Sequence, residues 1–525
     1  MKPIEIMDIT IRDAQQCLWA TRMTTEQMLP IARTMDEAGF HVLDLTGGAA
    51  FDASMMYLAE DPFERIRAMA KLVTKTPLNF NTRGQSIFRW MQYADDVAEF
   101  TLELMRRNGI RSVMVFDALN DFRNARATIR YAKALDFHII GAVTYTISPV
   151  HTDEHFVSKA MDLVAMGVNA VEIKDPSGLL TPERARELIP KMRVAVGQTQ
   201  LQLHSHCTFG HGLDTYSETL ALGERGVDLF HATSKPLAYG YALPPHDYVL
   251  DEIAKAGRST RIDRAAISEM EKYFTTITRR SGREPGRVLP VQSVDVDHQV
   301  PGGMMSNLVR QLTDQGQIHR LPEVLDEIGR VRRDLGWPIV VSPMAQYLGT
   351  QGVLNVLTGK RYQIVPQEIN QYVLGYYGEV AGPIDPEARQ LIAGDEEGIT
   401  VPPGELLPPM METYRKKFGA CASDEELALK IFYSARTVEE NKTSRLFAKP
   451  GAMATDAGSF LAREMLSNSS IEVCEIRKKD FYFSMNRGAS DAGSDAHRAD
   501  SGSRNDDDDD NDNDNNNVSD VAVAA

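Results

Sequence analysis

The feature that most constrains this chain is a repeat of short β-rich runs, each followed by a longer helical pattern, through its first half. Each run ends in polar residues, and the runs recur about every 30 to 40 residues, the size of one βα unit. There are eight of them: Ile4–Thr10, Val42–Thr46, Leu78–Thr82, Val113–Asp117, Ile139–Thr144, Ala170–Lys174, Leu201–His206 and Val227–Thr233. Eight parallel strands alternating with helices close into a barrel, so we predict an α/β fold with a (β/α)8 TIM barrel over residues 1–290.

Amphipathic segments typical of helices separate these runs. Thr181 precedes Pro182, which places a capping residue before a proline at the first helical position. The predicted helices include Thr25–Ala38, Asp153–Met166, Thr181–Val196 and Leu213–Gly226.

The strand ends supply a ring of polar residues for one mouth of the barrel, because the carboxyl ends of parallel strands lie together there. Buried charges need partners or a metal ion, so such a ring indicates a functional site. Its members are Arg12, Asp13, Asp44, Arg83, Asp117, Thr144, Tyr145, Lys174, Asp175, His204, His206 and Thr233.

Two histidines suggest a metal site at this mouth. His204 and His206 are two residues apart on one predicted strand, so both side chains point to the same face. Asp13, at the predicted end of the first strand, adds a carboxylate. Two imidazoles and one carboxylate suit Zn²⁺, Mn²⁺ or Co²⁺, and the residue types do not choose among these metals. A solvated or core histidine pair is the alternative interpretation.

Lys174 ends an otherwise apolar strand, where an isolated ammonium group is costly. One explanation is an ion pair with Asp175 or Glu172. Another is that the neutral amine accepts CO₂ and becomes a carbamate, which turns a cation into an anionic oxygen ligand.

The second half of the chain has a different pattern. Residues 291–448 carry mostly helical patterns and are predicted to form a second domain, whereas residues 449–483 match no pattern and remain unassigned. Residues 505–517 are all Asn or Asp, and such a composition cannot bury enough apolar surface to order itself. We therefore predict a disordered acidic tail over residues 484–525.

Composition excludes several classes of protein. The tail from Arg487 holds eleven acidic and three basic residues, which is half of the net charge of −16, and no basic stripe favours nucleic-acid binding. No apolar run is long enough to span a membrane, and the first residues lack the apolar core of a secretory signal. The four cysteines are widely spaced without a CxxC pair, so a reducing cytoplasm is the expected location.

Several motifs in this order resemble the carboxyltransferase domain of biotin-dependent enzymes, a family that includes pyruvate carboxylase, the oxaloacetate decarboxylase α subunit and the transcarboxylase keto-acid subunit. The resemblance covers about residues 3–390. The motifs in the barrel are Asp8–Gln16, Gly47–Asp52, Asp61–Arg65, Phe116–Asp121, Tyr145–His151, Ile173–Leu180 and His204–Thr208, and those in the second region are His298–Leu308, Gly349–Gly359 and Tyr372–Gly378.

The resemblance implies a metal-dependent carboxyltransferase or decarboxylase that moves CO₂ between biotin and a 2-oxo acid through an enolate. Asp13, His204 and His206 match the family's metal ligands, and Lys174 matches its carbamylated lysine ligand. Arg12, Gln16 and Arg83 match residues that bind the keto acid and hold its enolate. A homodimer is also implied.

Three departures from the family pattern stand out. Gln15 replaces a usual histidine, and Asn81–Gly84 replaces a Leu-Arg-Gly context. The family's proton-transfer threonine aligns with Tyr241, which is bulkier, and Thr233 lies a few residues upstream as a possible substitute.

Missing segments narrow the expected role. The chain has no Ala-Met-Lys-Met biotinylation motif, no carrier domain and no ATP-grasp carboxylase region, so we expect a separate biotin carrier protein, with a biotin carboxylase subunit as a further candidate partner. Two other interpretations stay open. One is a metal-barrel lyase or synthase similar to hydroxymethylglutaryl-CoA lyase, and the other is a non-catalytic assembly subunit.

Overall fold

The computed structural model describes residues 2–89, 91–294, 297–448, 473–478, 481–486 and 521–524. The chain divides into two compact units, Met1–Lys442 and Thr443–Ala525.

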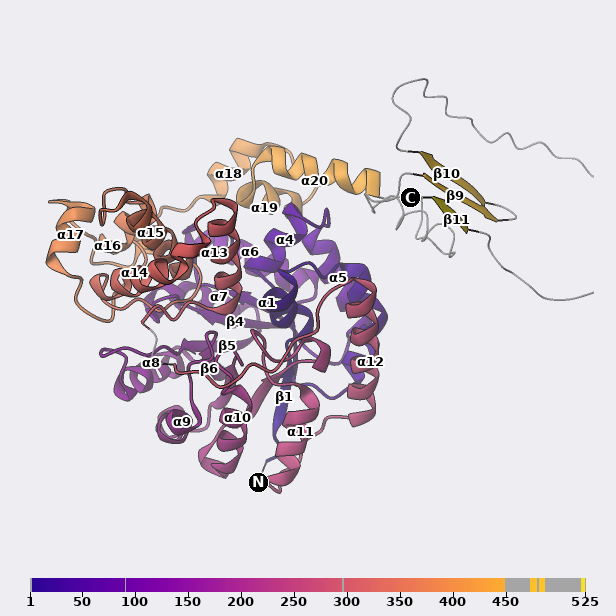
Figure 1. The fold of residues 1–525 in the computed structure, drawn as a ribbon, viewed down its shortest axis with the longest axis horizontal. Helices are drawn as coiled ribbons and strands as arrows, with labels where there is room; N and C mark the ends of the chain where they lie inside the picture. The colour runs from indigo at the N-terminus through magenta and orange to yellow at the C-terminus, as the bar shows by residue number, and fades with distance from the viewer. Residues whose placement is uncertain are drawn as a thin grey trace, which may run out of the picture. The chain divides into compact units, whose positions relative to one another are not determined.

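The first unit is built around a closed barrel of eight parallel strands, as predicted (Figure 1). Each strand pairs with the next one along the chain, and β8 closes the ring by pairing with β1. The strands are β1 (Glu5–Asp8), β2 (Val42–Gly47), β3 (Leu78–Thr82), β4 (Ser112–Phe116), β5 (His138–Thr144), β6 (Ala170–Asp175), β7 (Gln200–Ser205) and β8 (Leu229–Ala232).

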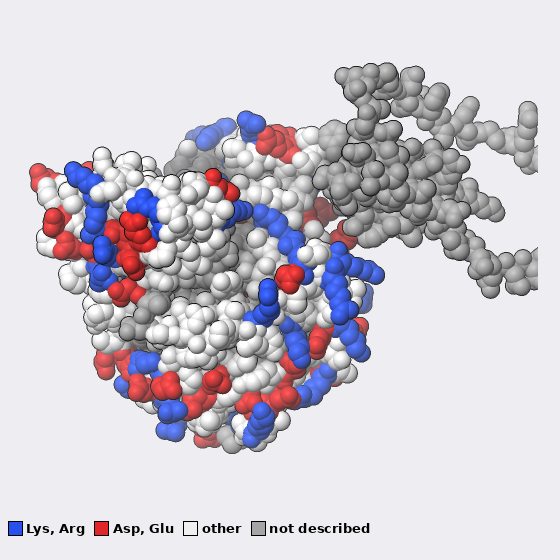
Figure 2. All heavy atoms as spheres, in the orientation of Figure 1, with Lys and Arg blue, Asp and Glu red and all other residues white. Residues whose placement is uncertain are grey.

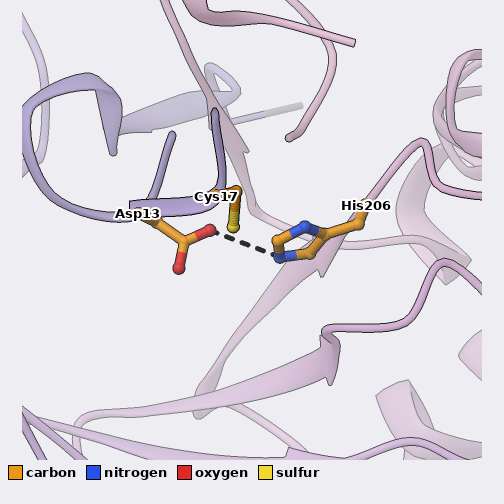
Figure 3. A group of neighbouring side chains, drawn as sticks. All are labelled: Asp13, Cys17 and His206. Atoms are coloured by element: carbon orange, nitrogen blue, oxygen red, sulfur yellow. Dashed lines mark ion pairs between the residues drawn. The ribbon is translucent and has the colours of Figure 1, made fainter. Parts of the chain in front are cut away.

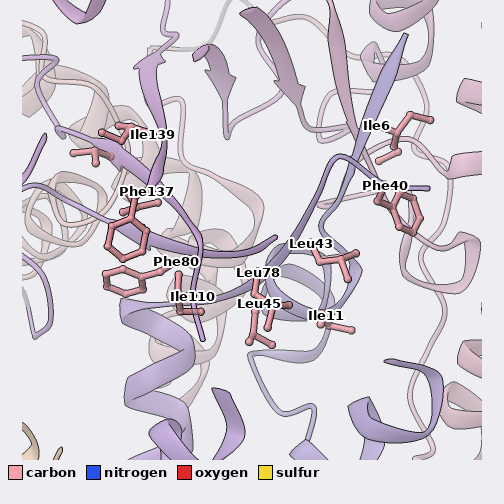
Figure 4. Packing of buried hydrophobic residues seen from close by; sticks show 14 of the residues in the cluster. Ile6, Ile11, Phe40, Leu43, Leu45, Leu78, Phe80, Ile110, Phe137 and Ile139 are labelled. Carbon is pink, nitrogen blue, oxygen red and sulfur yellow. The ribbon is translucent and has the colours of Figure 1, made fainter. Parts of the chain in front are cut away.

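Side-chain alternation along the strands produces two buried clusters, one between the strands and the surrounding helices and one inside the barrel. On β2, Leu43 and Leu45 join the hydrophobic cluster between strands and helices (Figure 4). Val42 instead joins a smaller cluster inside the barrel, together with Met7 and Ile140. Because successive residues point to opposite faces, the polar residues between the outward apolar ones face the barrel interior.

Helices surround the strands (Figure 1). The prediction for Asp153–Met166 is confirmed by α8, and Thr181 caps α9, where its Oγ1 accepts a hydrogen bond from the Arg184 N–H. The segment predicted as Thr25–Ala38 is divided at Pro30 into α2 (Thr25–Met28), a 3₁₀ turn and α3 (Ala32–Glu37). The longer helices of the barrel are α4 (Gly48–Met56), α5 (Pro62–Leu72), α6 (Asp95–Asn108), α7 (Arg126–Ala134), α8 (Asp153–Met166), α9 (Pro182–Val196), α10 (Gly212–Ala221), α11 (His246–Lys255) and α12 (Arg264–Arg280).

The region after the barrel is helical, as expected. It contains α13 (Gly302–Asp314), α14 (Leu321–Asp334), α15 (Met344–Thr358), α16 (Gln367–Val373), α17 (Pro386–Ala393), α18 (Met411–Phe418), α19 (Asp424–Phe432) and α20 (Ala435–Ala448). Residues of α13–α17 form their own hydrophobic cluster, whereas α19 packs into the cluster of the barrel. There Phe432 makes edge contacts with the rings of Phe88 and Tyr93.

Buried polar contacts join the α13–α17 region to the barrel. The Arg332 guanidinium is fully buried and donates to the Thr146 hydroxyl and the Ile147 carbonyl, both just beyond β5. In the loop that follows β4, the Asp121 carboxylate accepts from the Glu379 N–H. These contacts fix the second region against the loops that follow β4 and β5.

The second unit contains a three-stranded antiparallel sheet in the order β10 (Phe481–Asn486), β9 (Val473–Lys478) and β11 (Val521–Ala524). These strands lie in the segments predicted as unassigned and as a disordered tail. The rest of the predicted tail, including the Asp/Asn run, lies outside the described residues.

The surface charge and the helix lengths concern two predicted absences, binding to nucleic acid and crossing of a membrane. On the face shown in Figure 2, basic and acidic side chains are interspersed over the described residues rather than gathered into a basic stripe. Within the described part of the chain, none of the helices combines the length and the apolar character needed to cross a bilayer.

Candidate metal and carboxyl-transfer site

A π-helical turn places Arg12 and Asp13 at the barrel mouth. Strand β1 ends at Asp8, whose carboxylate accepts from the backbone N–H and the hydroxyl of Thr10. The turn Thr10–Ala14 follows, and all five of its residues are buried. Asp13 was predicted at the end of the first strand, and the prediction was wrong in this detail because the Asp8–Thr10 contacts end the strand five residues earlier. Single π-turns of this kind are frequent at functional sites.

Asp13, His204 and His206 bring three candidate ligand atoms together. Asp13 Oδ2 lies 3.3 Å from His206 Nε2 and 3.7 Å from His204 Nε2, and the two Nε2 atoms are 3.0 Å apart. His204 is on β7 and His206 immediately follows this strand. Asp13 Oδ2 is buried and, apart from this contact with His206, has no hydrogen-bond partner among the described residues. Figure 3 shows Asp13 and the His206 ring facing each other.

This spacing fits one divalent ion. Ligand distances of about 2.0–2.2 Å for nitrogen and carboxylate oxygen place neighbouring donors of one ion a little over 3 Å apart. His206 Nδ1 donates to the Tyr241 carbonyl oxygen at 2.7 Å, which leaves Nε2 as the nitrogen that can bind an ion once its proton has left. A ligating histidine usually donates its other ring N–H in this way. The donor set therefore suits Zn²⁺, Mn²⁺ or Co²⁺.

The electrostatics of the three groups support this assignment. Burial opposes ionisation of Asp13, but the adjacent Arg12 guanidinium holds the pKa of this carboxyl well below its usual range. Burial likewise opposes a charged His206, yet its hydrogen bond to Asp13 raises the pKa of His206 to about 10. For His204, burial and then the nearby Lys174 hold the pKa well below its usual value. The protein alone thus keeps a proton between His206 and Asp13, where an ion would displace it.

Lys174, the strand partner of His204, forms a buried ion pair inside the barrel. Its Nζ lies 3.1 Å from Glu172 Oε1, and both side chains point into the barrel from β6. Asp175, the other suggested partner, instead accepts from the backbone N–H groups of Leu179 and Leu180 and from the Ser205 hydroxyl. The lysine is therefore paired with Glu172.

Arg12 is fixed by two carboxylates. Its Nε donates to Asp44 Oδ2 at 2.5 Å and its Nη1 to Asp13 Oδ1 at 2.7 Å. The other oxygen of Asp44 accepts from the amides of Asn79 and Asn81. The guanidinium thus has a set orientation beside the candidate metal ligands, whereas Gln16 is half-buried on α1 (Gln15–Trp19).

Arg83 lines a pocket that is formed by residues of the barrel and of the second region. The pocket is lined by Arg83, Ser86, Gln92, Asp117, Ala118, Asn124, Pro343 and Tyr377. Burial lowers the pKa of Arg83 to about 10. The Nε of Arg83 donates to the Ser86 carbonyl oxygen at 3.2 Å, whereas Arg12 is engaged by Asp13 and Asp44. The two arginines therefore belong to different local networks.

The two hydroxyls considered for proton transfer differ in their surroundings. Thr233 is completely buried just beyond β8, and its Oγ1 lies 3.2 Å from the Leu237 carbonyl oxygen and 3.3 Å from the Thr10 hydroxyl. Tyr241 is half-buried, and its backbone carbonyl holds His206. The sequence reasoning missed this backbone contact, because no residue type reveals it.

Three further side chains of the site were not predicted. Cys17 lies one helical turn after Asp13 and groups with Asp13 and His206 (Figure 3). His231 on β8 pairs with His204, with their Nδ1 atoms 3.0 Å apart, and burial lowers the pKa of His231 to about 4. Gln202 on β7 faces His231. The alternation that placed His204 inside the barrel also places Gln202 there, two residues earlier, so the signal was present in the sequence.

The comparisons with known proteins cover both regions of the chain. The family described as HMGL-like matches residues 3–231, and the family described as conserved carboxylase domain matches residues 296–479. The match over the barrel would also suit the metal-barrel lyase considered from the sequence. The match over the second region is to a carboxylase domain and therefore favours the carboxyltransferase.

Individual relatives agree with this result. The chain is 40% identical over 468 residues to a subunit of pyruvate carboxylase from Methanocaldococcus jannaschii, which covers 87% of this chain and 81% of the relative. It is 34% identical to the methylmalonyl-CoA carboxyltransferase 5S subunit of Propionibacterium freudenreichii, over 79% of this chain and 82% of that protein. It is also 32% identical to the 2-oxoglutarate carboxylase large subunit of Hydrogenobacter thermophilus, over 82% of this chain and 66% of the relative.

A solved structure is similar throughout the fold. The carboxyl transferase domain of Rhizobium etli pyruvate carboxylase, determined with pyruvate and biocytin, superposes with a TM-score of 0.78 at 25% identity, over 86% of this chain and 79% of that one. The closed barrel, the helical second region and these relatives lead to one conclusion. The chain belongs to the carboxyltransferase family of biotin-dependent carboxylases.

Proposed function

We propose that this carboxyltransferase moves a carboxyl group between carboxybiotin on a separate carrier protein and a 2-oxo acid of the pyruvate or oxaloacetate type. The observation that carries the proposal is the convergence of Asp13, His204 and His206 at the barrel mouth, with the Arg12 guanidinium fixed beside them. The names of the relatives, which include pyruvate and 2-oxoglutarate carboxylases, support a 2-oxo acid as the acceptor.

The metal ligands in this proposal are Asp13, His204, His206 and a carbamylated Lys174. The bound ion, Zn²⁺, Mn²⁺ or Co²⁺, would supply a Lewis acid that polarises the carbonyl group of the keto acid. Asp13 Oδ2 supports this assignment, because this buried oxygen lies 3.3 Å from His206 Nε2 and 3.7 Å from His204 Nε2, so an ion held by all three atoms would replace the proton that Asp13 and His206 share.

Carbamylation of Lys174 requires the amine to lose its proton and leave Glu172. The neutral Nζ then attacks the carbon of CO₂, an N–C bond forms, and a second proton leaves the nitrogen. The product is an anion, so the ion pair with Glu172 is replaced by repulsion between two acidic groups. We propose that a bound ion would offset this repulsion, since a carbamate oxygen of Lys174 would be one of its ligands.

In the forward reaction, the N–CO₂ bond of carboxybiotin breaks and the keto acid loses a proton from the carbon next to its carbonyl group. That proton passes to the biotin nitrogen, and the enolate carbon attacks CO₂ to form the new C–C bond. We assign Arg12, Gln16 and Arg83 to the keto acid and its enolate, because oriented cations lower the energy of a developing oxyanion. Decarboxylation of oxaloacetate is the reverse sequence.

We propose the Tyr241 hydroxyl, rather than that of Thr233, as the group that passes the proton. Thr233 Oγ1 is fully buried against the Leu237 carbonyl and Thr10, so its proton is already engaged. Tyr241 is half-buried and adjoins the metal site through its own backbone carbonyl.

The partners follow from the same proposal. A separate biotin carrier protein presents biotin to the site, a biotin carboxylase subunit recharges it, and the chain works as a homodimer in the cytoplasm. Light scattering on the eluting protein in size-exclusion chromatography tests the dimer directly, since a monomer mass would contradict it. The described thiols Cys17, Cys207 and Cys421 are free, which agrees with a reducing compartment.

Replacing Asp13 or His206 by alanine should remove the metal. Each variant loses one ligand, so we expect metal affinity to fall by about 100-fold or more, and biotin-stimulated oxaloacetate decarboxylation to fall by roughly 10³-fold. Elemental analysis after dialysis measures the metal, and His211→Ala, beyond the site on the same loop, is the matched control. Full metal content in both variants would show that the ligand assignment is wrong.

Lys174→Arg should lose the carbamate while it keeps a cation, because a guanidinium does not form a carbamate under these conditions. We expect Lys174→Arg and Lys174→Ala to lose metal alike, and ¹³CO₂ to give a carbamate carbon signal only in the unmodified protein. Equal signals in unmodified and Lys174→Ala protein would contradict the modification.

Tyr241→Phe removes only the hydroxyl. It should slow biotin-stimulated decarboxylation by about 10²-fold, as expected for a lost general acid–base, and leave the metal content unchanged. Tyr239→Phe, two residues away, is the control and should keep its rate. If Tyr241→Phe is as fast as the unmodified protein, another group transfers the proton.

A further inference from the structure

A continuous chain of hydrogen bonds runs inside the barrel from the start of β1 to the metal site. Its members are Glu5, Gln200, Gln202, His231 and His204, which come from strands β1, β7 and β8. The successive donor–acceptor distances are 2.7 Å from Gln200 Nε2 to Glu5 Oε2, 2.7 Å from Gln202 Nε2 to Gln200 Oε1, 3.0 Å between His231 Nε2 and Gln202 Oε1, and 3.0 Å between the Nδ1 atoms of His204 and His231. The last three members are at most 2% exposed.

The carboxylate of Glu5, at the end far from the metal site, fixes which partner donates and which accepts in each of these hydrogen bonds. An ionised carboxylate only accepts hydrogen bonds. A hydrogen bond from His41 lowers the pKa of Glu5, so this group is ionised at neutral pH. Gln200 must therefore turn its NH₂ group toward Glu5, which leaves its carbonyl oxygen for Gln202. Gln202 is oriented in the same way, and its own oxygen faces His231.

The direction continues through the two imidazoles. Because Gln202 Oε1 accepts, His231 carries its proton on Nε2 and presents a lone pair at Nδ1. His204 then donates its Nδ1–H to His231, and its Nε2 keeps a lone pair. His204 Nε2 is the atom that lies 3.7 Å from Asp13 Oδ2 and 3.0 Å from His206 Nε2.

We propose that Glu5, Gln200, Gln202 and His231 form a positioning relay that fixes the metal-binding tautomer of His204. The inference rests on the metal site proposed above and extends it to four residues that do not touch the ion. His206 reaches the same tautomer by a shorter route, through the Tyr241 carbonyl. Without the relay, His204 could carry its proton on Nε2, where it would point at the ion and block binding.

Groups that orient a ligating histidine are worth about 10–100-fold in metal affinity. His231→Phe keeps a buried ring but removes the acceptor, so it should weaken Co²⁺ binding by about this factor. His231→Asn offers a carbonyl oxygen to the His204 N–H and should restore most of the affinity. Glu5→Leu removes the carboxylate that sets the direction of the hydrogen bonds. It should therefore also weaken Co²⁺ binding, although Glu5 lies at the other end of the strands from the metal site.

The measurement is the dissociation constant for Co²⁺ by competition with a chelator, together with the visible spectrum of the bound ion and the thermal midpoint of the metal-free protein. Glu37→Leu, an exposed carboxylate on α3, is the matched control for Glu5→Leu and should change nothing. The relay predicts that affinity falls in His231→Phe and Glu5→Leu and recovers in His231→Asn. Suppose instead that His231→Phe and His231→Asn lose the same Co²⁺ affinity, and that this loss parallels a fall in the thermal midpoint of the metal-free protein. His231 would then act through packing alone, which would contradict the relay.

A last variant separates this inference from the proposed function. If His204→Ala abolishes Co²⁺ binding while His231→Phe and Glu5→Leu bind as tightly as the unmodified protein, the relay is wrong and the metal site stands. If His204→Ala binds Co²⁺ as before, the proposed metal site is wrong and the relay with it.

Discussion

Closure of eight parallel strands buries most of the side chains that face the barrel interior, and the site depends on how the charged members of this inner face are paired. Part of the interior is apolar, with Met7, Met114 and Ile140 among its residues. The rest holds ionisable and amide groups on β1, β2, β3, β6, β7 and β8. Water does not compensate these groups there, so each must meet a partner or an ion. Arg12 meets Asp44 and Asp13, and Lys174 meets Glu172, while the second oxygen of Asp13 faces the two histidines at the candidate metal position.

The strand pattern made most of the barrel predictable from sequence. The ends of all eight strands lie within two residues of their predicted positions, because a strand buried on its outer face by Leu, Ile, Val and Phe is easily recognised. Alternation predicted that His204 and His206 share one face, and Lys174 was predicted at the end of its strand; the structure pairs Lys174 with His204 across β6 and β7. The position of Asp13 was less predictable, because it depends on a π-helical turn and on local contacts of Asp8 that no periodicity reveals.

Pairings between distant residues were the least predictable part of the site. The relay links Glu5 to Gln200 across 195 positions in sequence, and the link exists only because β1 and β7 both begin at the same end of the barrel. The choice of Glu172 over Asp175 as the partner of Lys174 also depends on the neighbours, since Ser205 and two backbone N–H groups already occupy Asp175. A single sequence places such residues on a face, but strand register decides which of them touch.

The central claim is that the mouth of this barrel performs the keto-acid half of a biotin-dependent carboxyl transfer. The most direct test is oxaloacetate decarboxylation by the purified chain, with its metal content measured, in the presence and absence of free biotin. The account predicts pyruvate formation that free biotin stimulates, at about one metal ion per chain. A metal-loaded protein that forms no pyruvate with biotin would contradict it.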